Sequence, residues 1–391
     1  MISGITKSVL PIIVVSQLFC TSLWFASNAV LSDLVYDFGL AQSALGHITS
    51  AVQFGFIIGT LVYAILTIAD RFSPSKVFLI SAIAGAIFNL GITLDDLNLT
   101  SILSFRFLTG FFLAGIYPVG MKIAADYYEK GLGKSLGFLV GALVVGTAFP
   151  HLLKEFTGAL PWRLVLILTS GLAVSGGILI FALIPNGPFR RQSQKPDFTA
   201  IMKVFGNKKF RPAAFGYFGH MWELYTFWAF VPLMLTTFIK LHPEVVLNIP
   251  LLSFLIIGLG GIACVMGGYL SQSYGPKKIA SFALFLSGTC CLLSPLIFLV
   301  NSSVLLVGFL IFWGLVVIAD SPLFSTLVAH NTVAESKGTA LTIVNSIGFS
   351  ISIISIQLIN GTQDSFDSRF IYMYLALGPI LGLIALYKNN D

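Results

Sequence analysis

Long apolar runs recur along this 391-residue chain, and their length constrains its fold more than any other feature. A helix needs about 20 apolar residues to cross the hydrocarbon core of a bilayer, and these runs are of that size. The sequence therefore predicts an all-α integral membrane protein with twelve transmembrane helices. The runs cover residues 9–31, 42–68, 76–94, 101–123, 134–156, 162–184, 212–238, 247–271, 278–299, 303–328, 338–360 and 369–387.

Charged residues make up only 10% of the chain, against about 25% in soluble globular domains. The net charge of +6 comes from Lys and Arg in loops beside the apolar runs, a pattern that reports membrane topology and not a nucleic-acid partner. The four cysteines fall inside apolar runs without metal-finger spacing, and the nucleophiles are scattered. We therefore expect no enzyme activity, no catalytic residues, no metal and no cofactor, and a monomer whose partners are lipid, protons and a small solute.

Most Lys and Arg residues lie on the side of the membrane that holds the N-terminus. The opposite side holds only Lys154, Arg163, Lys240 and Arg369, while Arg106 lies within a helix. Positive residues concentrate in cytoplasmic loops, so both termini are predicted to be cytoplasmic. The expected location is the plasma membrane, which in a bacterium is the inner membrane.

The two halves of the chain repeat in parallel. The segment IADRFSPSKV at residues 68–77 is similar to GGYLSQSYGPKKI at residues 267–279. The fourth and tenth helices also match, because Gly110 with Gly314 and Pro118 with Pro322 are each 204 residues apart. Parallel repeats of six helices are typical of one large transporter fold. The predicted domains are a six-helix bundle at 1–184, a basic cytoplasmic linker at 185–211 and a second bundle at 212–391.

These motifs resemble those of the major facilitator superfamily over essentially the whole chain. Asp70, Arg71 and Lys76 resemble the family's loop motif after the second helix, and RFLTGFFLAG, which begins at Arg106, resembles its fourth-helix motif. The resemblance implies alternating access, with the two bundles rocking around a substrate. It also implies a gating latch in which Asp70, beside Arg71, meets the start of the eleventh helix.

One subgroup within the superfamily is the nitrate/nitrite porters. The segment GFFLAGIYPVGMKIAADYYEKG is similar to theirs, but the arginines that nitrate porters carry in the second and eighth helices are missing. Their glycine-dense pattern in the fifth helix is missing as well. The subgroup and the substrate therefore stay unassigned.

The stretch Phe215–Phe230 carries His220 and Glu223 in an otherwise apolar helix. Ionisable residues inside a membrane are costly, so their default interpretation is functional. We interpret Glu223 as the proton-coupling residue, with His220 sharing the proton, contacting substrate or packing as a hydrogen-bonded ring. Gly216 and Gly219 share the face of Glu223 and are expected to leave room for something small beside it.

Two further charges sit inside predicted helices. Arg106 must face water, a carboxylate or an anion, so it is either an anion-binding residue or a fixed partner of Glu223. Asp320 precedes Ser321 and Pro322, which predicts a kink and a gating role. The alternative for Asp320 is a hydrated carboxylate near the cytoplasmic face.

Aromatic and polar residues of three helices are candidates for the substrate site. Such stripes are also typical of packing, which is the alternative interpretation. The predicted substrate-binding residues, besides Arg106, are Trp24, Asn28, Tyr117, Trp222, Tyr225, Thr226 and Trp228.

The combined hypothesis is a proton-coupled secondary transporter of a small organic or inorganic anion, working as a symporter. A drug/proton antiporter is the first alternative, although the fifth helix lacks the Gly-Pro pair usual in exporters. A transition-metal importer using His220, Met221, Cys264 and Met266 is a weaker alternative, and a receptor without transport activity is another. The sequence leaves open the substrate, the direction of transport, and whether the coupling ion is a proton or sodium.

Overall fold

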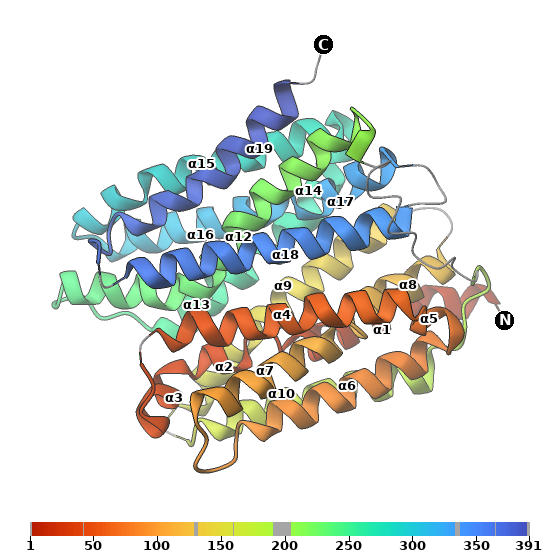
Figure 1. Cartoon of the computed structure of the whole chain (residues 1–391), viewed down its shortest axis with the longest axis horizontal. Coiled ribbons are helices and arrows are strands. Elements are labelled where there is room, and N and C mark those ends of the chain that lie inside the picture. Colours follow the sequence, from red (N-terminus) through yellow and green to blue (C-terminus); the bar gives the residue numbers. More distant parts are fainter. Residues whose placement is uncertain are drawn as a thin grey trace. The chain divides into compact units, whose positions relative to one another are not determined.

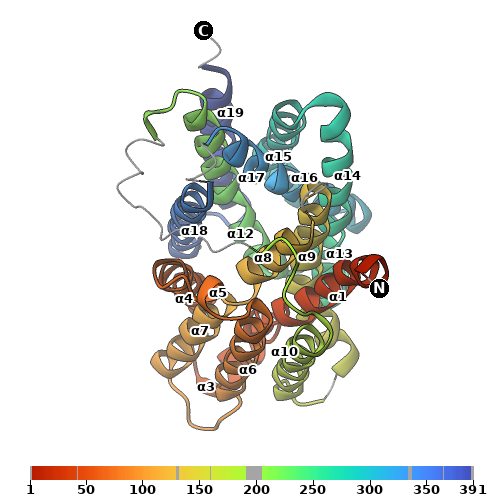
Figure 2. The same ribbon diagram turned by 90° about the vertical axis from the view of Figure 1, so that its right-hand side faces the viewer.

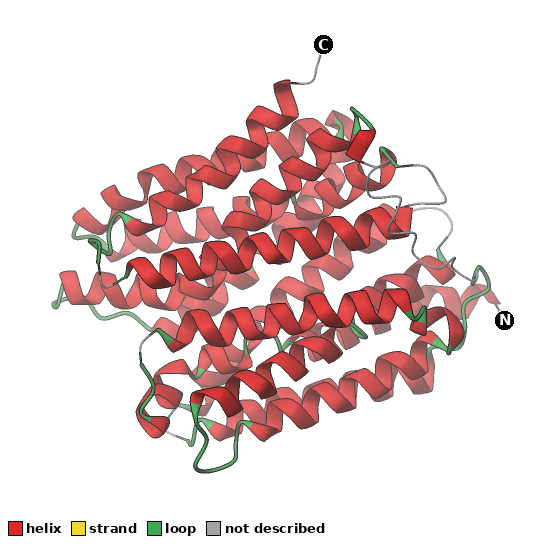
Figure 3. Ribbon diagram, viewed as in Figure 1, coloured by secondary structure: helices red, strands yellow, loops and turns green. Residues whose placement is uncertain are grey.

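The computed structural model describes residues 2–41, 43–128, 132–158, 160–190, 205–332, 337–363 and 365–388. Helices dominate these ranges, and no strand occurs within them (Figure 3). The predicted all-α class is confirmed.

Eleven helical segments in the described part of the chain are long and apolar enough to cross a membrane. A twelfth, shorter apolar helix at Ser8–Thr21 overlaps the first predicted span. The eleven are Ala44–Ile65, Pro74–Gly91, Leu99–Tyr127, Gly137–Thr157, Arg163–Leu183, Phe210–Leu241, Ile249–Tyr274, Pro276–Leu299, Ser303–His330, Gly338–Thr362 and Ile371–Lys388. The protein is therefore a multi-pass membrane protein.

The chain folds into two compact units, Met1–Lys195 and Pro196–Asp391. The division falls within residues 191–204, which lie outside the described residues, so the predicted linker bounds stay a prediction. The first unit (Figure 1) contains α1 (Ile2–Thr21), α2 (Ala26–Ala29), α3 (Leu31–Phe38), α4 (Ala44–Ile65), α5 (Ile68–Arg71), α6 (Pro74–Gly91), α7 (Leu99–Leu113), α8 (Tyr117–Tyr127), α9 (Leu132–Thr157) and α10 (Arg163–Leu183).

The described part of the second unit is helical as well. It contains α12 (Phe210–Leu241), α13 (Ile249–Gly258), α14 (Gly260–Tyr274), α15 (Pro276–Leu299), α16 (Ser303–Ala319), α17 (Ser321–His330), α18 (Lys337–Thr362), η2 (Ile371–Ala376) and α19 (Leu377–Lys388). Within this unit α12 packs against α17, α18 and α19, while α14 and α15 pack on α16 (Figures 1 and 2).

The first predicted span is not one continuous helix. After α1 ends at Thr21, the chain makes two tight turns in which Leu23 donates to the Cys20 carbonyl and Trp24 to the Thr21 carbonyl. These short-range bonds replace the regular helical ladder and leave nearby carbonyls without their usual partners. The prediction of an unbroken helix over 9–31 is wrong for this reason.

Proline breaks the fourth and tenth helices at equivalent places. Pro118 lies in the first turn of α8 and Pro322 in the first turn of α17. A proline has no backbone N–H and removes the bond to the carbonyl four residues earlier, so α7 and α16 end just before these positions. The kink predicted at Pro322 is confirmed by the break between α16 and α17, and Pro118 lies at an equivalent break, whereas α9 continues through Pro150.

Glycine contacts show the same repeat at atomic scale. A Cβ at Gly110 would lie 1.9 Å from the Val52 carbonyl oxygen, and one at Gly314 would lie 2.1 Å from the Ile256 oxygen. Both the glycines and their partners are 204 residues apart. In each unit, therefore, α7 or α16 approaches the preceding helix so closely that only glycine fits.

Replacing Gly110 by Ala tests this contact. The new methyl group would have to push α7 away from α4, and overpacking of this kind costs about 1–3 kcal/mol. We expect Gly110→Ala to lower the thermal unfolding temperature of the purified protein and its yield. Gly308→Ala is the matched control, because a Cβ there meets nothing within 4 Å. Equal unfolding temperatures for the two variants would contradict the close approach.

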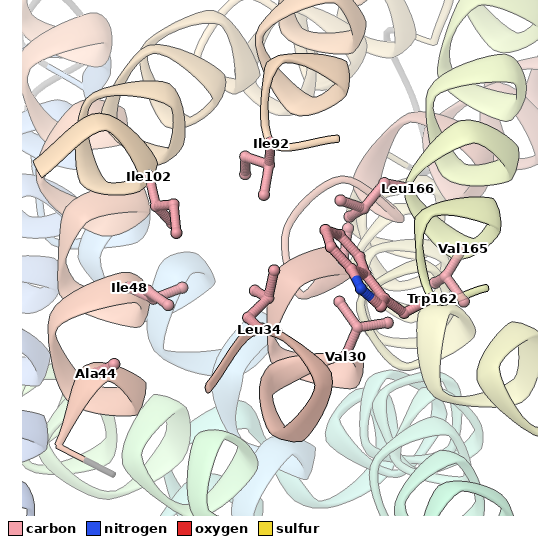
Figure 4. Packing of buried hydrophobic residues seen from close by; sticks show 10 residues of the cluster. Val30, Leu34, Ala44, Ile48, Ile92, Ile102, Trp162, Val165 and Leu166 are labelled. Atoms are coloured by element: carbon pink, nitrogen blue, oxygen red, sulfur yellow. The ribbon is translucent and has the colours of Figure 1, made fainter. Parts of the chain in front are cut away.

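A cluster of buried apolar side chains closes one end of the first unit. It joins Val30 and Leu34 from the broken first segment to Ile48, Ile92 and other residues of α4, α6, α7 and α10 (Figure 4). These contacts hold α2 and α3 against the bundle. The helix break therefore lies in a packed environment.

Candidate functional site

Glu223 on α12 is fully buried and holds three hydrogen bonds from neutral donors. The Trp313 indole N–H donates to Oε1 over 2.6 Å, and the Cys291 thiol donates to the same oxygen over 3.3 Å. The Ser287 hydroxyl donates to Oε2 over 2.8 Å. No Lys, Arg or His side chain among the described residues forms an ion pair with this carboxyl group. Glu223 is therefore a buried carboxyl group that neutral donors hold and that has no counter-charge among the described residues of its unit.

The three donors come from two neighbouring helices. Ser287 and Cys291 are four residues apart on α15, so they share one face, and Trp313 projects from α16. Phe227, one turn beyond Glu223, stacks near Trp313 with ring centroids 4.6 Å apart. Packing and hydrogen bonding together fix the carboxyl group at the meeting point of α12, α15 and α16.

His220 and Asp320 form a second buried pair, one turn away along α12. The imidazole Nδ1 lies 2.7 Å from Asp320 Oδ1, and each side chain is 1% exposed. Asp320 is the residue between α16 and α17. The alternative of a hydrated Asp320 near the cytoplasmic face is wrong, because neighbouring helices exclude solvent from it.

The two glycines beside Glu223 serve helix packing. A Cβ at Gly219 would lie 2.3 Å from the Gly378 carbonyl oxygen of α19, and one at Gly216 would lie 2.4 Å from the ring of Phe324 on α17. The expectation of free space beside Glu223 is wrong, since α17 and α19 fill it. The glycines instead let α12 sit close enough for its polar face to be buried.

Arg106 on α7 is fully buried and clamps the break after α1. Its guanidinium donates to the Leu23 carbonyl over 3.0 Å, to the Trp24 carbonyl, and to Asn89 Oδ1 over 3.4 Å. Asn89 in turn donates to Ser170 over 3.0 Å and to Thr169 over 3.2 Å. The predicted pairing with Glu223, which belongs to the other unit, stays a prediction. Arg106 therefore satisfies the carbonyls that the helix break exposes.

This clamp leaves the positive charge of Arg106 without an acidic neighbour. No Asp or Glu of the described chain lies within ion-pair distance of it, and its Nε–H has no hydrogen-bond partner. The interpretation of Arg106 as an anion-binding residue stays a prediction. A buried positive charge that only dipoles balance favours this interpretation.

The predicted substrate-binding residues fall into separate groups. In the first unit, Trp24 packs on Phe56 with centroids 4.9 Å apart, and Asn28 donates to Thr49 over 2.8 Å. Tyr117, the first residue of α8, belongs to the same unit. Their role in binding stays a prediction.

The remaining predicted substrate residues lie on α12. Tyr225 stacks edge-on with Trp228 at 5.3 Å, Thr226 donates to Ser355 over 2.9 Å, and the Trp222 indole donates to the Tyr374 carbonyl over 3.0 Å. The hydrogen bonds of Thr226 and Trp222 are made to α18 and to the η2 segment, not to Glu223. The structure gives each a packing role, and their contact with substrate stays a prediction.

Of the predicted gating residues, Asp70 belongs to a polar cluster at the α5 end of the first unit. Lys122 Nζ lies 2.6 Å from Asp70 Oδ1 and 3.9 Å from Asp126 Oδ1, so the contact with Asp126 is the weaker of the two. Arg190 donates to the backbone carbonyls of Asp70 and Phe72, whereas the Arg71 side chain is exposed. The predicted contact of Asp70 with the eleventh helix stays a prediction.

Sequence reasoning missed the partners of the buried carboxyl groups. The missed residues are Ser287, Cys291 and Trp313, and Ser287 and Cys291 are spaced four residues apart, which places them on one helical face. That spacing was a usable signal. No group of three or more His, Cys, Asp or Glu side chains in the described ranges could hold a metal ion. The metal-importer alternative, whose set includes Met221 and Met266, stays a hypothesis.

Curated relatives match a part of the chain. The 4-hydroxybenzoate transporter PcaK of Acinetobacter baylyi is 30% identical over 169 residues, which cover 40% of this chain and 36% of the relative. The niacin transporter NiaP of the same organism is 30% identical over 132 residues, covering 31% of this chain and 29% of the relative. The matched segment thus spans about a third of the length of these relatives.

Solved structures match the whole fold. The human organic anion transporter MFSD10 has a TM-score of 0.75 at 13% identity, covering 97% of this chain and 99% of that one. The proton:xylose symporter XylE has a TM-score of 0.71 at 13% identity, with coverage of 99% and 96%. The family model described as Major Facilitator Superfamily matches residues 13–356. With its helical repeat and these matches, the chain belongs to the major facilitator superfamily of membrane transporters.

Proposed function

We propose that the protein is a proton-coupled symporter of a small organic anion, in which Glu223 carries the proton. The observation that carries this proposal is a fully buried carboxyl group held by three neutral donors and by no cation. A carboxylate in a membrane interior is costly when no positive charge compensates it. Such a group favours binding a proton, which is what a coupling site must do.

The Ser287 hydroxyl suits both protonation states of Glu223. It lies 2.8 Å from Glu223 Oε2 and 3.2 Å from the Leu284 carbonyl oxygen, so its single proton can go to either acceptor. When Glu223 is ionised, Ser287 donates to Oε2. When Oε2 carries a proton, Ser287 accepts that proton's hydrogen bond and donates to Leu284. Protonation therefore leaves no buried polar atom unpaired at this oxygen.

Oε1 is the less suitable oxygen for the proton. It already accepts hydrogen bonds from Trp313 and Cys291, and an indole N–H can only donate. A proton on Oε1 would point a second donor at the Trp313 N–H, and two donors cannot form a hydrogen bond with each other. The proposed proton position is therefore Oε2, beside Ser287.

Arg106 supports an anionic substrate. It cannot lose its proton, and its neighbours neutralise it only through dipoles of carbonyl and amide groups. A buried unpaired positive charge raises the affinity of its surroundings for anions. One proton travelling with a monovalent anion would make the transport electroneutral.

The relatives favour an organic over an inorganic anion. Both 4-hydroxybenzoate and niacin are aromatic ring compounds with one carboxylate group, and transporters of both match this chain at 30% identity. We infer a small organic carboxylate as the substrate class. The two rival substrate classes, cationic drugs and metal ions, have no comparable support.

Uptake by reconstituted protein tests this function. Proteoliposomes with an alkaline interior are given labelled 4-hydroxybenzoate, nicotinate or nitrate, or are preloaded with a lipophilic cationic dye. We expect accumulation of at least one organic carboxylate, and no accumulation when a protonophore removes the pH gradient. Expulsion of preloaded dye driven by the inward proton gradient, without uptake of any anion, would establish the drug antiporter instead.

A further inference from the structure

The break between α16 and α17 is surrounded by groups that hold it in one arrangement. Because Pro322 has no N–H, the Ile318 carbonyl lacks its helical donor, and it accepts instead from the Asp320 N–H and from the Cys264 thiol of α14 at 3.6 Å. The Asp320 carbonyl accepts the Leu323 and Phe324 N–H groups that begin α17. Asp320, at the centre of this break, is tied through its side chain to His220 of α12.

The His220–Asp320 pair has polar atoms that no other group satisfies. Both ring nitrogens of His220 and both carboxyl oxygens of Asp320 are buried without a hydrogen-bond partner, and Nδ1 and Oδ1 are in ion-pair contact with each other. A carboxylate oxygen with no donor is unfavourable in a low-dielectric interior, because it forgoes both hydration and hydrogen bonding. Binding of a proton at Oδ2 would remove the negative charge of the carboxyl group and thereby weaken the contact between Oδ1 and Nδ1.

The charge balance of the buried cluster formed by His220, Glu223 and Asp320 also favours a proton on Asp320. Among the described groups in this cluster, only His220 can be positive, whereas Glu223 and Asp320 can each be negative. With His220 and Asp320 both charged, the cluster is neutral only while Glu223 holds a proton. When Glu223 is ionised, neutrality returns if Asp320 gains a proton and His220 stays an imidazolium.

We propose that the His220–Asp320 pair at the α16–α17 break is a second proton-binding site, which takes a proton on Asp320 Oδ2 when Glu223 gives one up. The inference rests on the proposed role of Glu223. In the exchange an O–H bond breaks at Glu223 and another forms at Asp320, with no change of oxidation state. The proton thereby reaches the break in the tenth helix, where a changed charge weakens the tie to α12.

Few other titratable groups face the pair. Tyr217 on α12 lies with its ring centroid 6.0 Å from that of His220, and the Cys264 thiol comes from α14. From α15 only the thiols Cys290 and Cys291 approach the neighbouring Glu223. On α17 and α19 the charged residues His330 and Lys388 are terminal. The site therefore depends on His220, Asp320 and Glu223.

Isotope-edited infrared spectroscopy of the purified protein tests the proposal with protons as the only ligand. Acidification of wild type is expected to produce a carboxylic-acid band that shifts on labelling with isotopic aspartate and is lost in Asp320→Asn. The band should persist in Glu223→Gln but appear at lower pH, because a neighbouring negative charge is gone. Asp320→Glu should transfer the band from the aspartate label to the glutamate label, which excludes misfolding as the cause of its loss.

Asp367→Asn is the control. Asp367 is in a loop outside the helices, and hydrogen bonds from Arg369 lower the pKa of its carboxyl group, so it stays ionised to more acidic pH than an ordinary aspartate. Its removal should leave the band unchanged. If no aspartate band is lost in Asp320→Asn while the protein stays folded, the pair is a permanent ion pair and the inference is wrong. A missing glutamate band for Glu223 would instead refute the proposed function.

Discussion

Glu223→Gln is expected to abolish substrate accumulation driven by a pH gradient while sparing exchange of substrate across the membrane. Glutamine reproduces the hydrogen bonds of the protonated acid: its oxygen accepts from Trp313 and Cys291, and its amide donates to Ser287. The side chain would then be fixed in the proton-loaded form. Binding and conformational exchange should continue, but no proton can be released.

The size of this effect follows from the gradient. One pH unit is worth about 1.4 kcal/mol, so a symporter moving one proton with each anion accumulates substrate about tenfold per unit. The accumulation ratio of Glu223→Gln should fall to about one, while counterflow of labelled against unlabelled substrate stays close to wild type. Glu244→Gln is the matched control, since Glu244 is an exposed loop residue that pairs with Asn301. Uphill accumulation by Glu223→Gln would remove the residue from the coupling step.

Arg106→Ala is expected to lower both stability and transport. The substitution leaves the Leu23 and Trp24 carbonyls and Asn89 Oδ1 without their donor, at a cost of about 1–3 kcal/mol for each buried group that stays unsatisfied. It also removes the charge that favours an anion. The unfolding temperature should fall by several degrees, and uptake should be lost.

Arg106→Lys separates the two roles. An ammonium group keeps the charge but cannot reproduce the planar fork that bridges two successive carbonyls and Asn89. We expect a stability between those of wild type and Arg106→Ala, with a raised KM for the anion. Arg369→Ala, in an exposed loop, should change neither property. If Arg106→Ala unfolds at the wild-type temperature, the carbonyl clamp is not a stabilising element.

Much of the fold could be predicted from local pattern. The lengths of the apolar runs identified the spans, and the match of Gly110 with Gly314 extends in the structure to their carbonyl partners. Proline chemistry predicted the break before α17 at Pro322, and the repeat match of Pro118 with Pro322 extends in the structure to the break before α8. Each of these features depends on residues close together in sequence or on a repeat.

The features that could not be predicted depend on distant partners. The break after α1 contains neither glycine nor proline, and its carbonyls are satisfied by Arg106, more than eighty residues away. The depth of Asp320 also depended on its neighbours, because a residue near a predicted helix end can be hydrated or covered by α12. Only the packing distinguishes these cases.

The two units carry different kinds of charge. The first unit holds Arg106, whose charge is fixed, and its repeat partner in the second unit is the buried Leu310. The second unit holds His220, Glu223 and Asp320, all of which can exchange a proton. We propose that the first unit provides the attraction for the anion and that the second unit moves the proton.

Proton movement caused by substrate is the most direct test of this account. Lightly buffered proteoliposomes without an imposed gradient receive, on the outside, the organic anion that the wild type accumulates, and the external pH is recorded. We predict alkalinisation of the outer medium with about one proton taken up per anion, and none with Glu223→Gln. Anion uptake by the wild type with no change in external pH, or with acidification, would contradict proton symport.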